Sequence, residues 1–147
     1  MTPNPDPRPL ILQKLDGHWT VTGNIKSKPV QYHVVNVPAL QGQFTEISME
    51  DVKVPSQYEA RIFIGFDGDT NTVIAHWMDN FGVNYSIPYG TGSLSENAIT
   101  FIVPYPDGSF KDSFVYNPED DSWTLAITAQ QPDSTWKHFA KYDFRPA

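Results

Sequence analysis

The sequence predicts an all-β fold: a single closed antiparallel up-and-down barrel of about ten strands, with a short N-terminal helix capping one end. Three observations predict this fold. Apolar residues recur with a period of two from His18 onward, as in strands with one buried face. Short turn clusters separate the apolar runs. The chain is 14% aromatic and holds 13 Pro and 9 Gly, a composition typical of β-rich domains.

The N-terminal part of the chain precedes this pattern. Residues 1–9 (MTPNPDPRP) include prolines, which lack the amide donor of helices and sheets, so we expect a flexible Pro-rich arm. Residues 10–15 (LILQKL) place apolar side chains on one helical face, which predicts a turn or two of helix ended by Asp16-Gly17. Residues 10–147 are expected to form one barrel domain.

The strands follow one another with short links. Alternating runs cover residues 18–25, 58–66, 73–78, 83–89, 99–103, 114–116, 123–127 and 136–144. In the last run, His138 and Tyr142 are expected on one face and Phe139 on the other. Turn clusters such as Asp107-Gly108 leave no room for crossover helices, so neighbouring strands should pair antiparallel in chain order. Closure then removes the exposed edges of the sheet.

Composition and charge exclude several classes of partner. The chain carries 17 acidic and 10 basic residues, for a formal net charge of −7. An acidic surface repels phosphate backbones, so we expect no nucleic acid and no anionic membrane as a partner. No run approaches the ~20 apolar residues of a membrane span. Cysteine is absent and no secretory signal is visible, which favours the cytoplasm and leaves the periplasm open.

Two motifs resemble those of a known family. Gly17-His18-Trp19 opens the first strand just after the short helix. Further along, Gly65-Phe66-Asp67 is followed by His76-Trp77-Met78-Asp79 and then Phe81-Gly82. Together they resemble lipocalin-like bacterial domains of unknown function in the calycin superfamily.

This resemblance implies a structural role for Trp19. In the superfamily, the tryptophan of the first motif packs across one barrel end against a basic residue of the last strand. Lys141 and Arg145 are both candidates for that residue here, and the sequence does not choose between them. Either would place a cation over the indole face and help to close the barrel.

Histidines and acidic residues form no metal or haem motif. His18, His33, His76 and His138 lack the short spacings of local zinc sites, so no metal is expected. Some haem-binding barrels use an axial histidine, but nothing singles one out here, and no cofactor is expected. Residues 67–71 (DGDTN) begin like a calcium loop, yet Thr72 and Met78 stand where that loop needs glycine and glutamate.

The barrel interior is where we expect the function. The chain has 4 Trp, 7 Tyr and 9 Phe, and tyrosine combines an apolar body with a polar tip that suits a partly wet cavity. We therefore expect a small apolar or amphipathic ligand inside the barrel. The residues expected to contact it are Tyr58, Arg61, His76, Trp77, Tyr85 and His138.

Two other functions stay open at this stage. An enzyme would use the same cavity with His76 and a carboxylate as an acid–base pair. The strand carboxylates are Glu46, Glu59, Asp79 and Asp112, whose mutual distances the sequence does not give, so no catalytic residue is assigned. A scaffold protein would instead have a filled barrel and could form a homodimer through its wall. A cavity of at least ~300 Å³ separates the first two functions from the third.

Overall fold

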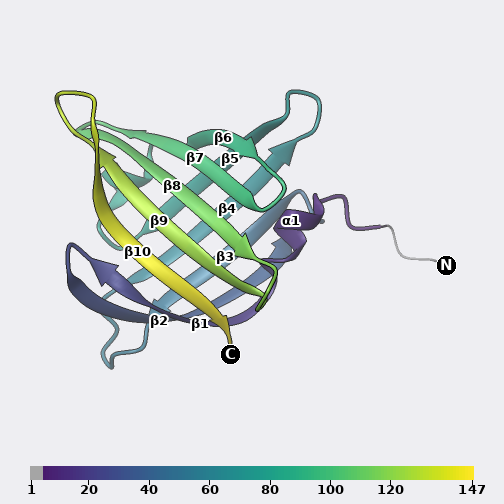
Figure 1. Ribbon diagram of the computed structural model, residues 1–147, viewed down its shortest axis with the longest axis horizontal. Coiled ribbons are helices and arrows are strands. Elements are labelled where there is room, and N and C mark those ends of the chain that lie inside the picture. The colour runs from purple at the N-terminus through teal and green to yellow at the C-terminus, as the bar shows by residue number, and fades with distance from the viewer. Residues whose placement is uncertain (1–4) are drawn as a thin grey trace.

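The sheet closes on itself. In the computed structural model, which describes residues 5–147, ten antiparallel strands follow one another around a barrel and β1 pairs with β10 (Figure 1). The elements are α1 (Leu10–Gln13), β1 (Gly17–Ile25), β2 (Lys28–Ala39), β3 (Phe44–Asp51), β4 (Glu59–Asp67), β5 (Thr72–Asp79), η1 (Val83–Ser86), β6 (Gly90–Leu94), β7 (Ala98–Tyr105), β8 (Gly108–Asn117), β9 (Ser122–Gln130) and β10 (Trp136–Pro146). Within the described residues, no helix is both long enough and apolar enough to cross a membrane. The predicted fold class, strand order and closure are confirmed.

The segment between β5 and β6 departs from the prediction. The alternation of residues 83–89 predicted a strand, but this segment contains the 3-10 helix η1, and β6 begins at Gly90, where a turn was expected. Its apolar side chains point into solvent, with Val83 83% and Ile87 76% exposed. The alternation here therefore does not reflect a buried face, so it carries no strand signal.

The last strand contains a second departure. The register of β10 against β9 shifts between His138 and Ala140, a bulge that inserts Phe139. The Phe139 ring packs against Phe110 with centroids 4.9 Å apart, while His138 is exposed. The expectation that His138 shares the interior face with Tyr142 is wrong, because the inserted residue reverses the alternation.

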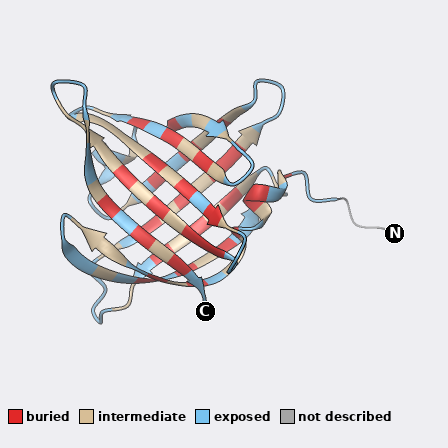
Figure 2. Ribbon diagram, viewed as in Figure 1, coloured by how far each residue is buried: buried red, intermediate tan, exposed pale blue. Residues whose placement is uncertain are grey.

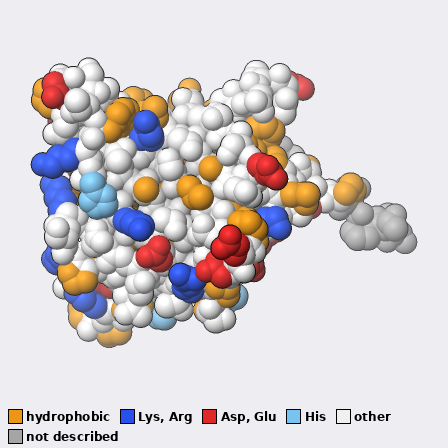
Figure 3. Space-filling view, viewed as in Figure 1, with side chains coloured by type: hydrophobic (Ala, Val, Ile, Leu, Met, Phe, Trp, Pro, Cys, Tyr) orange, Lys and Arg blue, Asp and Glu red, His pale blue; other side chains and the backbone are white. Residues whose placement is uncertain are grey.

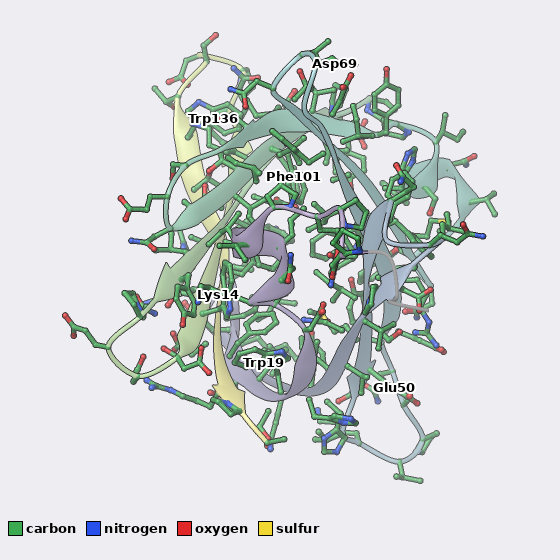
Figure 4. All side chains as sticks on the ribbon, turned by 90° about the vertical axis from the view of Figure 1, so that its right-hand side faces the viewer. Lys14, Trp19, Glu50, Asp69, Phe101 and Trp136 are labelled. Carbon is green, nitrogen blue, oxygen red and sulfur yellow. The ribbon has the colours of Figure 1, made fainter. Side chains whose placement is uncertain are left out.

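Side chains from three strands hold the α1 segment across one end of the barrel (Figure 4). A helix leaves its last carbonyl groups without partners inside the helix. The indole of Trp19 donates to the Leu15 carbonyl oxygen at 2.7 Å, and the Asn36 amide donates to the same oxygen at 2.8 Å. The indole of Trp123 donates to the Lys14 carbonyl oxygen at 3.2 Å. These bonds satisfy the end of the helical segment and fix it over the barrel.

Trp19 packs against an aromatic ring rather than a cation. Its ring meets Phe144 edge to face, with centroids 6.4 Å apart. Lys141 is exposed, and Arg145 pairs with Asp120 at the surface, with nitrogen and oxygen 2.5 Å apart. Neither Lys141 nor Arg145 is therefore the partner of Trp19, because the alternation of β10 turns both outward while Phe144 faces in.

The buried basic residue at this end comes from the N-terminal segment. The Arg8 side chain is only 3% exposed, and its guanidinium contacts Asp6 and Asp16 at 2.6 Å each. It also donates to Thr45 Oγ1 at 2.8 Å. Arg8 thus anchors part of the expected arm to the barrel, while residues 1–4 of that arm lie outside the described residues.

The half of the barrel next to α1 is solidly packed. Buried side chains alternate with intermediate or exposed ones along each strand (Figure 2). The largest fully buried side chains in this half include Leu12, Leu15, Phe101, Phe114, Trp123 and Phe144. Phe114 lies between two rings, with centroids 6.2 Å from Phe101 and 6.1 Å from Phe144. We call this aromatic layer of Phe101, Phe114 and Phe144 the floor, because it separates the packed half from the other half of the barrel.

Candidate functional site

The other half of the barrel is hollow. A cavity of about 1000 Å³ opens to solvent at the end away from α1, where the β1–β2 and β9–β10 turns lie (left in Figure 1). This volume is at the upper end of the ~300–1,000 Å³ usual for small-molecule sites. The inward side chains of its wall are Ile25, Tyr58, Trp77, Asp79, Tyr105, Phe110, Asp112, Ile127, Ala129, Phe139 and Tyr142. The barrel is therefore not filled at this end.

One part of the wall is a satisfied hydrogen-bond network. Tyr58, just before β4, donates its hydroxyl to Asp79 Oδ2 at 3.0 Å. The same hydroxyl accepts from the Trp77 indole at 3.2 Å. Burial, with the Asp79 charge as a further cause, raises the pKa of Tyr58 well above its usual range. Tyr58 therefore stays a neutral donor, and these polar groups are already partnered.

Asp112 is the buried carboxyl group of the wall. It faces inward from β8 between Phe110 and Phe114, is only 4% exposed, and its Oδ1 has no hydrogen-bond partner. Acidic side chains are almost never fully buried without a partner. Burial raises the pKa of Asp112 to about 8, because desolvation disfavours the charged form. The free carboxyl group can donate a hydrogen bond when neutral and attract a cation when ionised.

Two tyrosines share the cavity with Asp112. Tyr105 ends β7 and Tyr142 faces in from β10. Burial is the main cause that raises the pKa of both hydroxyls, and the charge of Asp112 contributes to each. Tyr142 also packs on Tyr32, with ring centroids 5.7 Å apart. The surroundings of Asp112 therefore consist of neutral phenols and apolar rings.

Four of the six predicted ligand-contacting residues line the cavity: Tyr58, Trp77, Tyr85 and His138. Tyr58 and Trp77 belong to the inner wall. Tyr85 is 50% exposed on η1 at the mouth. His138 is exposed at the rim, where its Nε2 lies 3.3 Å from Asn24 Oδ1.

Arg61 and His76 lie on the outside of the barrel. Arg61 pairs with Glu59 at 3.0 Å on the surface of β4. His76 is exposed and packs on Tyr89, with ring centroids 5.8 Å apart. The expectation that they reach the interior is wrong, because each is flanked along its strand by inward-facing residues. The structure therefore forms no acid–base pair between His76 and a carboxylate in the cavity.

Sequence reasoning missed the burial of Asp112 in the cavity wall. It named this residue only as one of four strand carboxylates. A signal was available, since Asp112 shares its parity with Phe110 and Phe114 in β8, so a buried face there must contain the acid. Phe139 was missed for a different reason, because a bulge has no clear mark in the sequence.

The charges of the molecule are unevenly spread. On the face shown in Figure 3, Lys and Arg side chains gather toward the left edge, on the side of the cavity mouth, and Asp and Glu gather toward the lower right. Among residues 5–147, no three His, Asp or Glu side chains come together closely enough to hold a metal ion.

Comparison with known proteins gives a family. The family described as "Protein of unknown function (DUF1579)" matches residues 4–145, nearly the whole chain. No curated protein matches the sequence. Because the family match runs from residue 4 to residue 145, it includes the Arg8 segment and all ten strands except the last residue of β10. The chain therefore belongs to the DUF1579 family of proteins of unknown function.

Proposed function

We propose that the protein is a lipocalin-like binding protein that holds a small amphipathic molecule in the hollow half of its barrel. The observation that carries this proposal is the cavity of about 1000 Å³, open at one end and closed at the other by α1 and the aromatic floor. A pocket closed on one side and open on the other admits a molecule and buries most of its surface.

The wall favours a ligand with an apolar body. Its rings include Trp77, Tyr105, Phe110 and Phe139, and transfer of apolar surface from water to such rings contributes about 25 cal/mol per Å². The unpartnered carboxyl group of Asp112 adds one polar contact. An apolar body with one polar end therefore matches this wall.

Binding is tested first with the protein as purified and then with a dye. Native mass spectrometry of freshly purified protein would reveal a co-purified molecule as added mass. Nile red, whose emission rises in apolar surroundings, then reports binding to the emptied cavity. The matched variants are Ala129→Trp, which fills the cavity from β9, and Ala126→Trp, which adds the same ring on the outer face of that strand.

We expect the unchanged protein and Ala126→Trp to bind the dye, and Ala129→Trp to lose at least ninety per cent of the emission. Equal emission from both variants would place the dye on the exposed apolar segment 81–89 instead and would contradict binding in the cavity. Circular dichroism of both variants checks that the barrel is retained.

A further inference from the structure

We infer that the molecule bound in the cavity carries an amine, whose ammonium form pairs with the Asp112 carboxylate on the cavity wall. This inference rests on the proposed function and deepens it, since it names the chemical class of ligand for the same cavity.

Asp112 lies where a side chain could bind the polar group of a ligand. It lies at the inner end of the cavity, because Phe114, two residues further along β8, belongs to the fully buried floor. Its neighbours in the sheet, Phe101 on β7 and Ile127 on β9, offer no polar side chain. Since the Asp112 carboxyl group lines the cavity and has no hydrogen-bond partner in the protein, a cationic donor in the cavity would supply one.

The ionisable groups of the inner cavity wall around Asp112 are acids and phenols, whereas Lys26, Lys137 and His138 line the cavity at its mouth. Tyr105 comes from β7, β9 carries no ionisable residue, and Tyr142 comes from β10. Across the cavity, Asp79 is held by Tyr58. An anionic ligand would be repelled by the Asp79 carboxylate and would oppose ionisation of Asp112, whereas an ammonium group would favour the ionised form of Asp112 and would meet ring faces that attract cations.

The basic side chains lie at the rim or outside. Lys111, next to Asp112 on β8, faces outward and its ammonium lies 4.5 Å from the centre of the Trp136 ring. Lys26 and Lys137 line the cavity only at its mouth, and the Lys26 ammonium lies 5.6 Å from the centre of the Phe139 ring. No lysine of the wall is therefore paired with Asp112, and its place is open to a cation from the ligand.

Rings lead from the mouth toward Asp112 and would hold the rest of such a ligand. Phe110 contacts Phe139 and Tyr105, with ring centroids 4.9 Å and 5.4 Å apart. Phe110 also stands two residues before Asp112 on the same face of β8. An amine with an aromatic or similarly flat apolar body would therefore place its body on these rings and its ammonium group on the carboxylate.

Three probes with one body and different head groups test this inference: naphthylmethylamine, naphthylmethanol and naphthoate. Their affinities are measured by titration calorimetry on the full chain, on Asp112→Asn and on Glu96→Gln. The last is a matched control that removes one negative charge from an exposed turn at the other end of the barrel. We expect the amine to bind the unchanged protein about tenfold or more tightly than the alcohol, as for a hydrogen bond to a charged group. Naphthoate should bind most weakly.

The variants then separate the two proposals. Asp112→Asn should bring the amine down to the affinity of the alcohol and leave the alcohol unchanged, while Glu96→Gln should match the unchanged protein. Equal affinities of amine and alcohol, or a preference that survives in Asp112→Asn, would overturn the amine inference and leave binding in the cavity intact. Failure of all three probes to bind the unchanged protein would overturn both.

A second measurement needs no variant. Because burial raises the pKa of Asp112 to about 8, the free protein holds a proton there near pH 6, and pairing with an ammonium group expels it. Calorimetry in two buffers of different ionisation enthalpy should therefore show release of about one proton per bound amine and none per bound alcohol. Binding of the amine without proton release would overturn the inference even if Asp112→Asn failed to fold.

Discussion

The two halves of the barrel are built from the same strands but use their inward positions differently. On β8, Phe114 fills the half next to α1, whereas Phe110 and Asp112, further toward the mouth, line the cavity. On β9, Trp123 is fully buried and Ala129 leaves space. A change of side chains along β8 and β9, together with the bulge of β10 at Phe139, therefore divides one barrel into a packed half and a hollow half.

The halves also differ in how their polar groups are treated. In the packed half, the carbonyl groups at the end of the helical segment receive donors from Trp19, Asn36 and Trp123. Each half keeps one buried side-chain oxygen without a partner, Asn36 Oδ1 in the packed half and Asp112 Oδ1 in the hollow half. The Asn36 side chain is still held through its amide donor, whereas the Asp112 carboxyl group makes no hydrogen bond in the protein, so the buried carboxyl group contributes no such bond to the stability of the fold.

The largest expected contrast comes from removing one ring in each half. Phe114→Ala leaves a void among Phe101 and Phe144 and should lower the free energy of unfolding by about 3–5 kcal/mol. Tyr105→Ala enlarges a space that already exists and should cost less than about 1.5 kcal/mol. Urea denaturation followed by tryptophan fluorescence measures both. Equal losses would show that the cavity wall is as tightly packed as the floor.

A second contrast concerns the buried acid. An unfolded Asp titrates near pH 4, whereas the pKa of folded Asp112 is about 8, so the folded protein holds the extra proton between these values. The free energy of unfolding should therefore fall as pH rises from about 4 to about 8, by up to ~1.4 kcal/mol per pH unit. Asp112→Asn should remove this slope and stabilise the protein at pH 7 by about 2–4 kcal/mol. Denaturation at several pH values measures it, and a slope that persists in the variant would contradict the assignment.

The next largest expected change in stability comes from removing the Arg8 guanidinium at the packed end of the barrel. Arg8→Met keeps the length of the side chain but leaves Asp6 and Asp16 without their partner, at a cost of about 1–3 kcal/mol, because both carboxylates stay partly exposed. Arg8 lowers the pKa of Asp6 to about 2, so its contribution is full above pH 4 and is lost as pH falls toward 2. Thermal unfolding at several acidic pH values should show a steeper loss in the unchanged protein than in Arg8→Met. Parallel curves would contradict this role.

The sequence was sufficient to predict the barrel, because a period of two with short links admits few arrangements. The exceptions have physical reasons. Residues 83–89 alternate without a partner strand, and Phe139 sits in a bulge. Arg8 is held by Asp16 and Thr45, a contact that depends on the three-dimensional path of the chain.

The site was predicted only in part for related reasons. Alternation correctly turned Trp77 inward, and the same alternation should have kept Arg61 and His76 out of the expected site. The same alternation would have placed Asp112 inward between Phe110 and Phe114, although the sequence analysis did not assign it a face. The cost of its burial depends on Oδ1 finding no partner, which only the packed structure reveals. Periodicity thus predicts which face a side chain takes, and not whether its polar atoms are satisfied.

The smallest contrast compares two indoles that each donate one hydrogen bond. Trp19→Phe removes the donor to the Leu15 carbonyl in the packed half and should cost about 1 kcal/mol, since Asn36 still bonds that oxygen. Trp77→Phe removes the donor to Tyr58 beside the cavity and should cost about 0.5 kcal/mol or less, because solvent in the open cavity can replace it. Paired urea denaturation curves resolve the two values. A larger loss for Trp77→Phe would mean that the hollow half depends on its hydrogen-bond network for stability, and would reverse the division of roles between the two halves.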